Sequence, residues 1–254
     1  MAETGEQALA KGSINEVERS GSWVLRPAGP HSPFVQELLA ALADAGCGWA
    51  PRPGGLADDG RERVSFVPGL ADWELAARGG DPYAERAVLT ALRWVRRLHD
   101  LTVGPGGLVT CHGDLGVHNL IYTEDGGAAG LIDFDLAARG TRVDDLATAV
   151  KELARLGADG PASEQVTAAV ELLAAYGWDA VDVPALLDRI PTAFVDDLEF
   201  CLTQARAGNA FYEEWDRAGG ARQLCQRAER AEGLLPALRT AATVASAAAS
   251  RTAG

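Results

Sequence analysis

The sequence has few cysteines and no spacing of them that would staple a small fold. Four thiols occur far apart in the chain, at Cys47, Cys111, Cys201 and Cys225. Unpaired spacing of this kind predicts reduced thiols in a cytosolic protein. Cys111 stands beside His112, and His118 is close by, but the paired short spacings and the fourth ligand of a structural zinc site are missing. We therefore expect no zinc site there.

Long hydrophobic runs and an excess of basic charge are also missing. No stretch reaches the roughly 18 apolar residues that a membrane helix needs, and the first fifteen residues contain no apolar run typical of a secretory signal. The chain has 23 Lys and Arg against 36 Asp and Glu, a formal net charge of −13. This charge argues against nucleic-acid and anionic-membrane partners and is compatible with a cationic substrate. We expect a cytoplasmic monomer or dimer.

The first third of the sequence mixes strand and helix patterns. Residues 14–26 predict two strands joined by a turn at Ser20-Gly21. Residues 31–46 predict an amphipathic helix with Ser32 as N-cap, Pro33 at its first position and Gly46 as its end. These segments indicate a small α/β unit.

The rest of the chain becomes progressively helical. A Pro/Gly-rich loop over residues 50–62 leads into a short strand that Pro68-Gly69 ends. A long helix and three strand-like pieces follow, and from Val143 onward the pattern is almost entirely helical. The order predicts an α+β chain of two lobes: a small N-lobe over residues 1–68 and a larger, mainly helical C-lobe over residues 69–254.

The stretch TCHGDLGVHNLIY, residues 110–122, opens a predicted hairpin. A three-residue loop at Asp125-Gly126-Gly127 pairs residues whose numbers sum to 252, which places Asn119 opposite Asp133 at the open end. With Asp114 a few residues upstream, this makes a cluster of hard oxygen donors. Such a cluster suits Mg²⁺, which takes one or two protein oxygens and completes its shell with phosphates and water.

Polar residues at strand ends are often only turn and capping residues. Here, however, Asn119 follows Asp114 by five residues. An apolar-Asp-Phe-Asp turn begins at Ile132, and its first acid, Asp133, follows Asn119 by fourteen residues. The combination favours a functional site. HGDLGVHNLIY and GLIDFDLAARG resemble the aminoglycoside phosphotransferase and choline kinase-like superfamily, whose fold is protein-kinase-like. RRLHD at 96–100, DDLATAV at 144–150 and INEVERSGSWVLRPAGP resemble further segments of these proteins.

The resemblance implies roles for the two motif loops, the catalytic loop at 112–119 and the metal loop at 132–135. Asp114 would orient the acceptor hydroxyl and take its proton late in phosphoryl transfer. Asn119 and Asp133 would hold Mg²⁺ against the nucleotide phosphates. His112 belongs to the same catalytic motif and would pack and hydrogen-bond under the metal loop, while Asp135 would order that loop.

The resemblance also implies a binding site for ATP or GTP. The hinge near residues 65–69 would bind the purine edge, and the ring would lie between apolar side chains. The residues expected here are the backbone groups of Ser65, Phe66 and Val67 and the side chains of Leu25 and Ile132.

The phosphate side of this site departs from the kinase pattern. Arg26 stands where kinases usually have a lysine, and an arginine differs from it in reach and geometry. Glu37 of the following helix is the expected partner, although another register of that helix puts Val35 there instead. The phosphate-covering loop has only one glycine, so Ser13 and backbone amides would have to cover the phosphates.

The acceptor would bind between the catalytic loop and the C-terminal helices, within residues 143–240. Residues 190–216 carry six acids against one base, Arg206, and interleave them with aromatic residues, as expected for a cationic, hydroxylated ligand. Two amphipathic helices with solvated acidic faces would give the same pattern. The six acids are Asp196, Asp197, Glu199, Glu213, Glu214 and Asp216.

The leading hypothesis is a small-molecule kinase that phosphorylates a hydroxyl of an antibiotic, an aminoalcohol, a sugar or a related metabolite. The missing lysine and sparse glycines leave open a pseudokinase that binds a nucleotide or a partner without turnover. A kinase acting on peptide Ser/Thr hydroxyls in a biosynthetic pathway also remains open.

Overall fold

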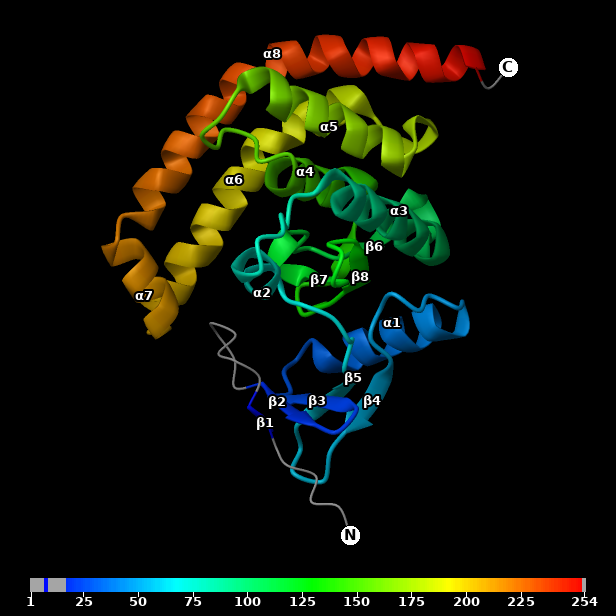
Figure 1. The fold of residues 1–254 in the computed structure, drawn as a ribbon, viewed down its shortest axis with the longest axis vertical. Coiled ribbons are helices and arrows are strands. Elements are labelled where there is room, and N and C mark those ends of the chain that lie inside the picture. Colours follow the sequence, from blue (N-terminus) through cyan, green and yellow to red (C-terminus); the bar gives the residue numbers. More distant parts are fainter. Residues whose placement is uncertain (1–6, 9–16, 253–254) are drawn as a thin grey trace.

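The computed structural model describes residues 7–8 and 17–252 of the chain. Figure 1 shows a sheet with one helix at one end of the molecule and a larger group of helices at the other. This arrangement confirms the predicted two-lobed α+β fold. Among the described residues, none of the helices combines the length and apolar character that crossing a membrane requires.

The small lobe is built on an antiparallel sheet in the order β1-β2-β3-β5-β4. Its strands are β1 (Gln7–Ala8), β2 (Glu18–Ser20), β3 (Trp23–Arg26), β4 (Pro53–Leu56) and β5 (Glu62–Ser65). The hairpin predicted around Ser20-Gly21 is present as β2 and β3, with Ser20 opposite Trp23. The loop prediction for residues 50–62 is wrong in part, because they include β4. Pro53 begins this edge strand, where a missing N–H breaks no ladder bond.

Helix α1 (Ser32–Asp44) packs an apolar stripe of Val35, Leu38, Leu39 and Leu42 into the core. Its predicted start is wrong by one residue, since His31 occupies the N-cap position. The Ser32 hydroxyl instead accepts a hydrogen bond from the Gly29 amide at 3.0 Å. The helix ends where the sequence predicts, before Gly46 with a φ of 75°.

The large lobe contains most of the helices and two short two-stranded antiparallel sheets (Figure 1). One sheet is the hairpin of β7 (Leu120–Tyr122) and β8 (Ala128–Leu131), and the other pairs β6 (Val109–Cys111) with β9 (Ala138–Gly140), which lie on either side of that hairpin in the chain. The helices are α2 (Asp72–Ala77), α3 (Glu85–Thr102), α4 (Arg142–Leu153), α5 (Ala162–Tyr176), α6 (Val183–Arg206), α7 (Ala210–Arg217) and α8 (Gly220–Thr252). Short 3₁₀ turns are η1 (Pro105–Gly107), η2 (Val117–Asn119) and η3 (Trp178–Ala180).

The two lobes touch through the chain that joins them and through a tryptophan pair. Leu70 and Tyr122 exchange two backbone hydrogen bonds of 2.8 Å, so the segment after Gly69 lies against β7. Trp49 stacks on Trp94 of α3 with ring centroids 5.6 Å apart. We place the boundary between the N-lobe (residues 1–68) and the C-lobe (69–254) at this joining segment, as a proposal.

Candidate active site

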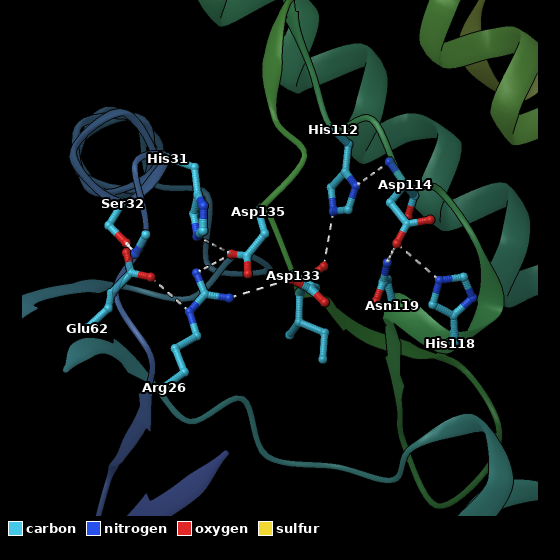
Figure 2. A network of polar contacts seen from close by, with 12 residues as sticks. Arg26, His31, Ser32, Glu62, His112, Asp114, His118, Asn119, Asp133 and Asp135 are labelled. Atoms are coloured by element: carbon cyan, nitrogen blue, oxygen red, sulfur yellow. Dashed lines mark hydrogen bonds and ion pairs between the residues drawn. The ribbon is translucent and has the colours of Figure 1, made fainter. Parts of the chain in front are cut away.

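Asp114 is held at the mouth of the catalytic loop by neighbours in its own segment. The side-chain amide of Asn119 donates to the Asp114 carbonyl at 2.8 Å and to its Oδ2 atom at 2.9 Å. The Nε2 atom of His118 lies 3.3 Å from the same Oδ2. Both contacts use one carboxylate oxygen, and Oδ1 has no hydrogen-bond partner among the described residues. Figure 2 shows the three side chains facing one another.

These contacts fix the charge of Asp114. Burial by itself would raise the pKa of its carboxyl, but the hydrogen bonds and charges of His118 and its neighbours outweigh burial and hold that pKa below the ordinary value. The hydrogen bond to Asp114 in turn raises the pKa of His118. Asp114 is therefore ionised at neutral pH, as a proton acceptor must be. His118 had no predicted role. Its spacing of four residues from Asp114 was the one sequence feature that indicated a contact between the two side chains.

A buried acid from the next helix supports the catalytic loop from behind. Asp145 of α4 accepts the backbone N–H groups of His112 at 2.7 Å and Gly113 at 2.9 Å. It also lies 2.9 Å from Nε2 of His99, whose Nδ1 is 2.7 Å from the Tyr176 hydroxyl. From the sequence, residues 144–150 were expected only to begin a helix, because the pattern DDLATAV does not indicate the direction of the Asp145 side chain.

His112 joins the catalytic loop to the metal loop. Its Nε2 atom lies 3.0 Å from the Ile132 carbonyl, and its Nδ1 accepts the Asp114 amide at 3.3 Å. The tautomer with its proton on Nε2 satisfies both contacts. The ring is fully buried and packs on Phe134, with centroids 4.6 Å apart. This geometry matches the packing and hydrogen-bonding place expected for His112.

The predicted register of the hairpin is wrong by one residue. The structure pairs Leu120 with Leu131, and the Ile132 amide donates to the Asn119 carbonyl at 2.9 Å. Asn119 therefore lies opposite Ile132 rather than Asp133. The turn closes between Thr123 and Gly127, one position earlier than the predicted loop, and the bulge between Ile121 and Tyr122 compensates for only half of the resulting shift. Asp133 comes next in the chain, and its φ of 64° turns the backbone there.

The donor set around this turn fits a magnesium ion. Asn119 uses its side-chain nitrogen to bind Asp114, so its amide oxygen points elsewhere, and within the described residues nothing donates to that oxygen. The Asp133 carboxylate is 48% exposed, and within residues 7–8 and 17–252 its one polar side-chain contact is Arg26 at 3.5 Å. An amide oxygen and an open carboxylate are hard ligands of the kind Mg²⁺ prefers. Both residues suit the metal role expected of them.

Arg26 of β3 faces the metal loop from the small lobe (Figure 2). Its Nη2 atom lies 2.7 Å from Oδ1 of Asp135, and its Nε atom donates to Glu62 Oε2 at 2.9 Å. The predicted pair with Glu37 is wrong: Glu37 is exposed, and the counter-ion comes from β5. Burial raises the pKa of the Asp135 carboxyl, which the charge of Arg26 partly offsets.

Two of the three backbone amides predicted to bind the purine edge are already hydrogen-bonded within the small lobe. The Ser65 amide donates to the Arg52 carbonyl at 2.9 Å and the Phe66 amide to the Ser22 carbonyl at 2.8 Å. Both amides are taken because β5 has neighbouring strands on each side, so neither can donate to a purine. Val67 follows the strand, and among the described residues its amide has no such partner. The remaining predicted nucleotide contacts are Leu25, which is 9% exposed, Ile132, which is partly buried, and Ser13, which lies outside the described residues.

The acidic acceptor region is less acidic than its sequence suggests. Asp196 pairs with Arg189 at 2.6 Å, and Glu214 pairs with Arg217. Glu213 and Asp216 line a hollow of about 500 Å³ between α6 and α7, together with Arg206 and Arg217. Glu199 is exposed. The bases Arg189 and Arg217 stand outside the window of residues 190–216, so counting charges within it missed them.

The sixth acid, Asp197, pairs with a lysine that sequence analysis did not single out. Lys151 of α4 is fully buried, and its Nζ atom contacts the Asp197 carboxylate and lies 3.4 Å from the Ala193 carbonyl. Burial raises the pKa of Asp197, while the charge of Lys151 and its hydrogen bond lower it. The charge of Asp197 is therefore balanced by Lys151.

Comparisons with known proteins identify the family of this chain. The trifolitoxin immunity protein of Rhizobium leguminosarum bv. trifolii is 33% identical over 152 residues, covering 52% of this chain and 56% of that relative, so the match spans about half of each. The aminoglycoside phosphotransferase APH(3'')-Id of Streptomyces rimosus, solved with ADP and streptomycin, has a TM-score of 0.51 at 19% identity and covers 73% of this chain and 90% of its own.

A choline/ethanolamine kinase family protein of Mesorhizobium loti has a TM-score of 0.53 at 18% identity, covering 93% of this chain and 92% of its own. These two structures share the fold with this chain. The sequence model of the phosphotransferase enzyme family matches residues 18–190. The chain therefore belongs to the phosphotransferase enzyme family.

Proposed function

We propose that the protein transfers the γ-phosphoryl group of ATP or GTP to a hydroxyl of a small molecule, with Asp114 as the catalytic residue. The observation that carries this proposal is the state of the Asp114 carboxylate. One oxygen, Oδ2, is fixed by Asn119 and His118, and the other has no partner among the described residues. A free, oriented oxygen on an ionised acid is suited to accept the proton of a bound hydroxyl.

The reaction requires no covalent bond between the protein and the transferred phosphoryl group. The acceptor oxygen forms a bond to the γ-phosphorus while the bond from that phosphorus to the β,γ-bridging oxygen breaks, and the nucleoside diphosphate leaves. Because the transition state is loose, the hydroxyl proton moves late, to Oδ1 of Asp114, and is then lost to water. Asp114 contributes by orientation, and Asp145 contributes by keeping the loop backbone in place.

Asn119 and Asp133 would hold Mg²⁺ in this proposal. The ion, when bound, neutralises charge on the phosphates during transfer. Asn119 offers its oxygen because its nitrogen is committed to Asp114, and Asp133 offers an open carboxylate. His112 keeps the two loops in register through the Ile132 carbonyl, one residue before Asp133.

The acceptor would lie between the catalytic loop and α6–α7. Aromatic side chains gather there: the Tyr212 ring contacts Phe200 and Phe211 with centroids 5.7 and 5.1 Å away. Glu199, Glu213 and Asp216 remain available to a cationic ligand. The relatives are named for an aminoglycoside, for choline or ethanolamine and for immunity to a toxin. We therefore favour an antibiotic or an aminoalcohol as the acceptor.

Calorimetric titration with ATP and with GTP, each with and without Mg²⁺, tests the proposal. We expect Mg²⁺ to strengthen nucleotide binding in the wild type and Asp133→Ala to remove that gain. Asp59→Ala is a matched control, because Asp59 also pairs with an arginine and is 51% exposed but lies in the β4–β5 loop. ADP or GDP release in the presence of aminoglycosides, macrolides, aminoalcohols and sugars then identifies the acceptor.

The alternatives predict different results. A pseudokinase binds nucleotide, or a partner alone, and releases no product with any acceptor. A peptide kinase transfers labelled phosphate to Ser/Thr peptides and not to small molecules. Failure of both nucleotides to bind the wild type would overturn the proposed function.

A further inference from the structure

The Arg26 guanidinium has two differently occupied edges. Its Nε atom is bound to Glu62, while its terminal nitrogens face Asp133 at 3.5 Å and Asp135 at 2.7 Å. The side chain is 10% exposed, so its position is fixed by these partners more than by water. One edge is therefore anchored in the sheet, and the other points to the metal loop.

The anchor is a fully buried carboxylate. Glu62 is 0% exposed and is the direct cross-strand partner of Arg26 in the β3–β5 register. Its Oε2 accepts from Arg26 and its Oε1 accepts from the Gln36 amide at 2.8 Å. A buried carboxylate without a counter-charge is strongly unfavourable, so Glu62 and Arg26 hold each other in place.

Helix α1 contributes an amide to this unit instead of an acid. The Gln36 nitrogen donates to Glu62 and to the Arg63 carbonyl, and its oxygen accepts the Gly55 amide at 2.7 Å. Gln36 thus ties α1 to β4 and β5 and orients Glu62. The acid next to it on the helix, Glu37, is exposed and takes no part.

We propose that Glu62 is a positioning residue for nucleotide binding, which holds the Nε edge of Arg26 so that its terminal nitrogens bind the nucleotide phosphates. This inference rests on the proposed function. It also explains why an arginine stands in β3. A guanidinium can bind the strand-borne carboxylate through Nε and a phosphate through its terminal nitrogens in a fixed planar geometry, whereas a lysine presents its three N–H donors from a single nitrogen.

The test compares ATP with adenosine, which lacks phosphates, for each variant in the presence of Mg²⁺. We expect Glu62→Gln to weaken ATP binding by about 10-fold or more, since a charge-assisted contact is lost, and to leave adenosine binding unchanged. Arg26→Lys should weaken ATP binding to a similar degree although it keeps the charge. Glu18→Gln is the matched control, because Glu18 pairs with Arg61 in the same sheet at 2.6 Å.

A charge exchange separates positioning from support of the fold. The double variant combines Gln36→Glu with Glu62→Gln, so that the carboxylate and the amide change places. The amide introduced at position 62 can then donate to the carboxylate introduced at position 36, and its oxygen can accept from Arg26. We expect ATP affinity to return to within about 3-fold of the wild type, because position 62 keeps its contacts with Arg26 and position 36 and only the hydrogen bond donated to the Arg63 carbonyl is lost. Thermal unfolding of each variant is measured alongside.

The outcomes distinguish the two proposals. If the wild type binds ATP and Glu62→Gln binds it equally well, the inference about Glu62 is overturned while the proposed function stands. The inference is overturned too if Glu62→Gln weakens adenosine as much as ATP, or if the exchange restores thermal stability but not ATP affinity. If Glu62→Gln does not fold, Arg26→Lys decides: unchanged ATP affinity in that variant overturns the inference. A wild type that binds no nucleotide overturns the proposed function and this inference together.

Discussion

The catalytic loop and the acidic helices α6–α7 are both rich in polar groups, yet their pairing has opposite consequences. In the catalytic loop, Asn119 and His118 bind one oxygen of Asp114 and leave the other ready for chemistry. In α6, bases from elsewhere in the chain cover Asp196 and Asp197 and remove much of their charge from the site. A cluster of polar residues therefore indicates function only when at least one of its polar atoms is left without a protein partner and can bind a ligand.

The largest expected effect is at Asp114. Asp114→Asn keeps the shape of the side chain but removes the ionised oxygen that would accept the hydroxyl proton. We expect turnover to fall by about 1,000-fold, within the usual range for a general base, with ATP affinity changed little. Initial rates of nucleoside diphosphate release with the identified acceptor measure the loss. Near-normal turnover would show that the free Oδ1 atom has no role in the reaction.

The next largest effect is a loss of stability expected at Asp145, which holds the backbone of the catalytic loop. Asp145→Ala removes the acceptor of the His112 and Gly113 amides and the partner of His99, and both histidines are fully buried. Leaving these donors unsatisfied should lower the free energy of unfolding by about 3–5 kcal/mol. Urea unfolding measures it, with Glu171→Ala, an exposed acid of α5, as the control. A loss below about 1 kcal/mol would contradict the supporting role of Asp145.

The same contrast explains what could be predicted from sequence. The two-lobed fold followed from the order of hydrophobic periods, and the geometry of Asp114 and Asn119 from a short motif, because their partners lie within a few residues. The Arg26–Glu37 pair failed because its real counter-ion, Glu62, reaches Arg26 through strand register, which a single sequence does not give. An acid at an inward-facing position of a strand, beside buried Val64, was the one available signal.

Small local features defeated the remaining predictions. The hairpin turn closes one position earlier than predicted, and a bulge compensates for only part of this shift, so Asn119 lies opposite Ile132 and not Asp133. The six acids of residues 190–216 looked unbalanced because Lys151, Arg189 and Arg217 lie outside that window. Lys151 in particular lies in a helix with several other charged residues, so its burial against Asp197 has no local signature.

Neighbouring acids of α6 allow a direct comparison of buried and exposed pairing. Asp197→Asn leaves the fully buried Lys151 with Glu152, 3.5 Å away, as its remaining carboxylate. We expect this variant to lose about 1–3 kcal/mol of unfolding free energy, because a buried charge loses its closest partner. Asp196→Asn breaks an exposed pair with Arg189 and should cost at most about 0.5 kcal/mol. Equal losses in urea unfolding would show that burial of Lys151 does not set the difference.

A small, pH-dependent effect should come from Asp144 of α4, which contacts α6. Its Oδ1 accepts from Arg189 of α6 at 2.9 Å, and its Oδ2 accepts the Thr141 amide at the start of α4. Burial raises the pKa of its carboxyl, but the Arg189 and Thr141 hydrogen bonds outweigh burial and bring the pKa below its ordinary value of 3.8. The ionised form is thus favoured in the folded protein. Its stabilising contribution is complete above the ordinary pKa and is lost as pH falls through the lower, folded value.

Asp144→Asn should therefore be less stable than the wild type at neutral pH by no more than about 1 kcal/mol, since the pair is partly exposed and the amide keeps some capping ability. The gap in urea midpoint should narrow below about pH 4, where the wild-type carboxyl begins to bind a proton. A gap that stays constant down to about pH 3 would mean that the loss came from helix capping geometry and not from charge. In that case the charge of Asp144 would contribute nothing to the contact between Arg189 of α6 and α4. Charge changes on the two helices would then have additive effects on the free energy of unfolding.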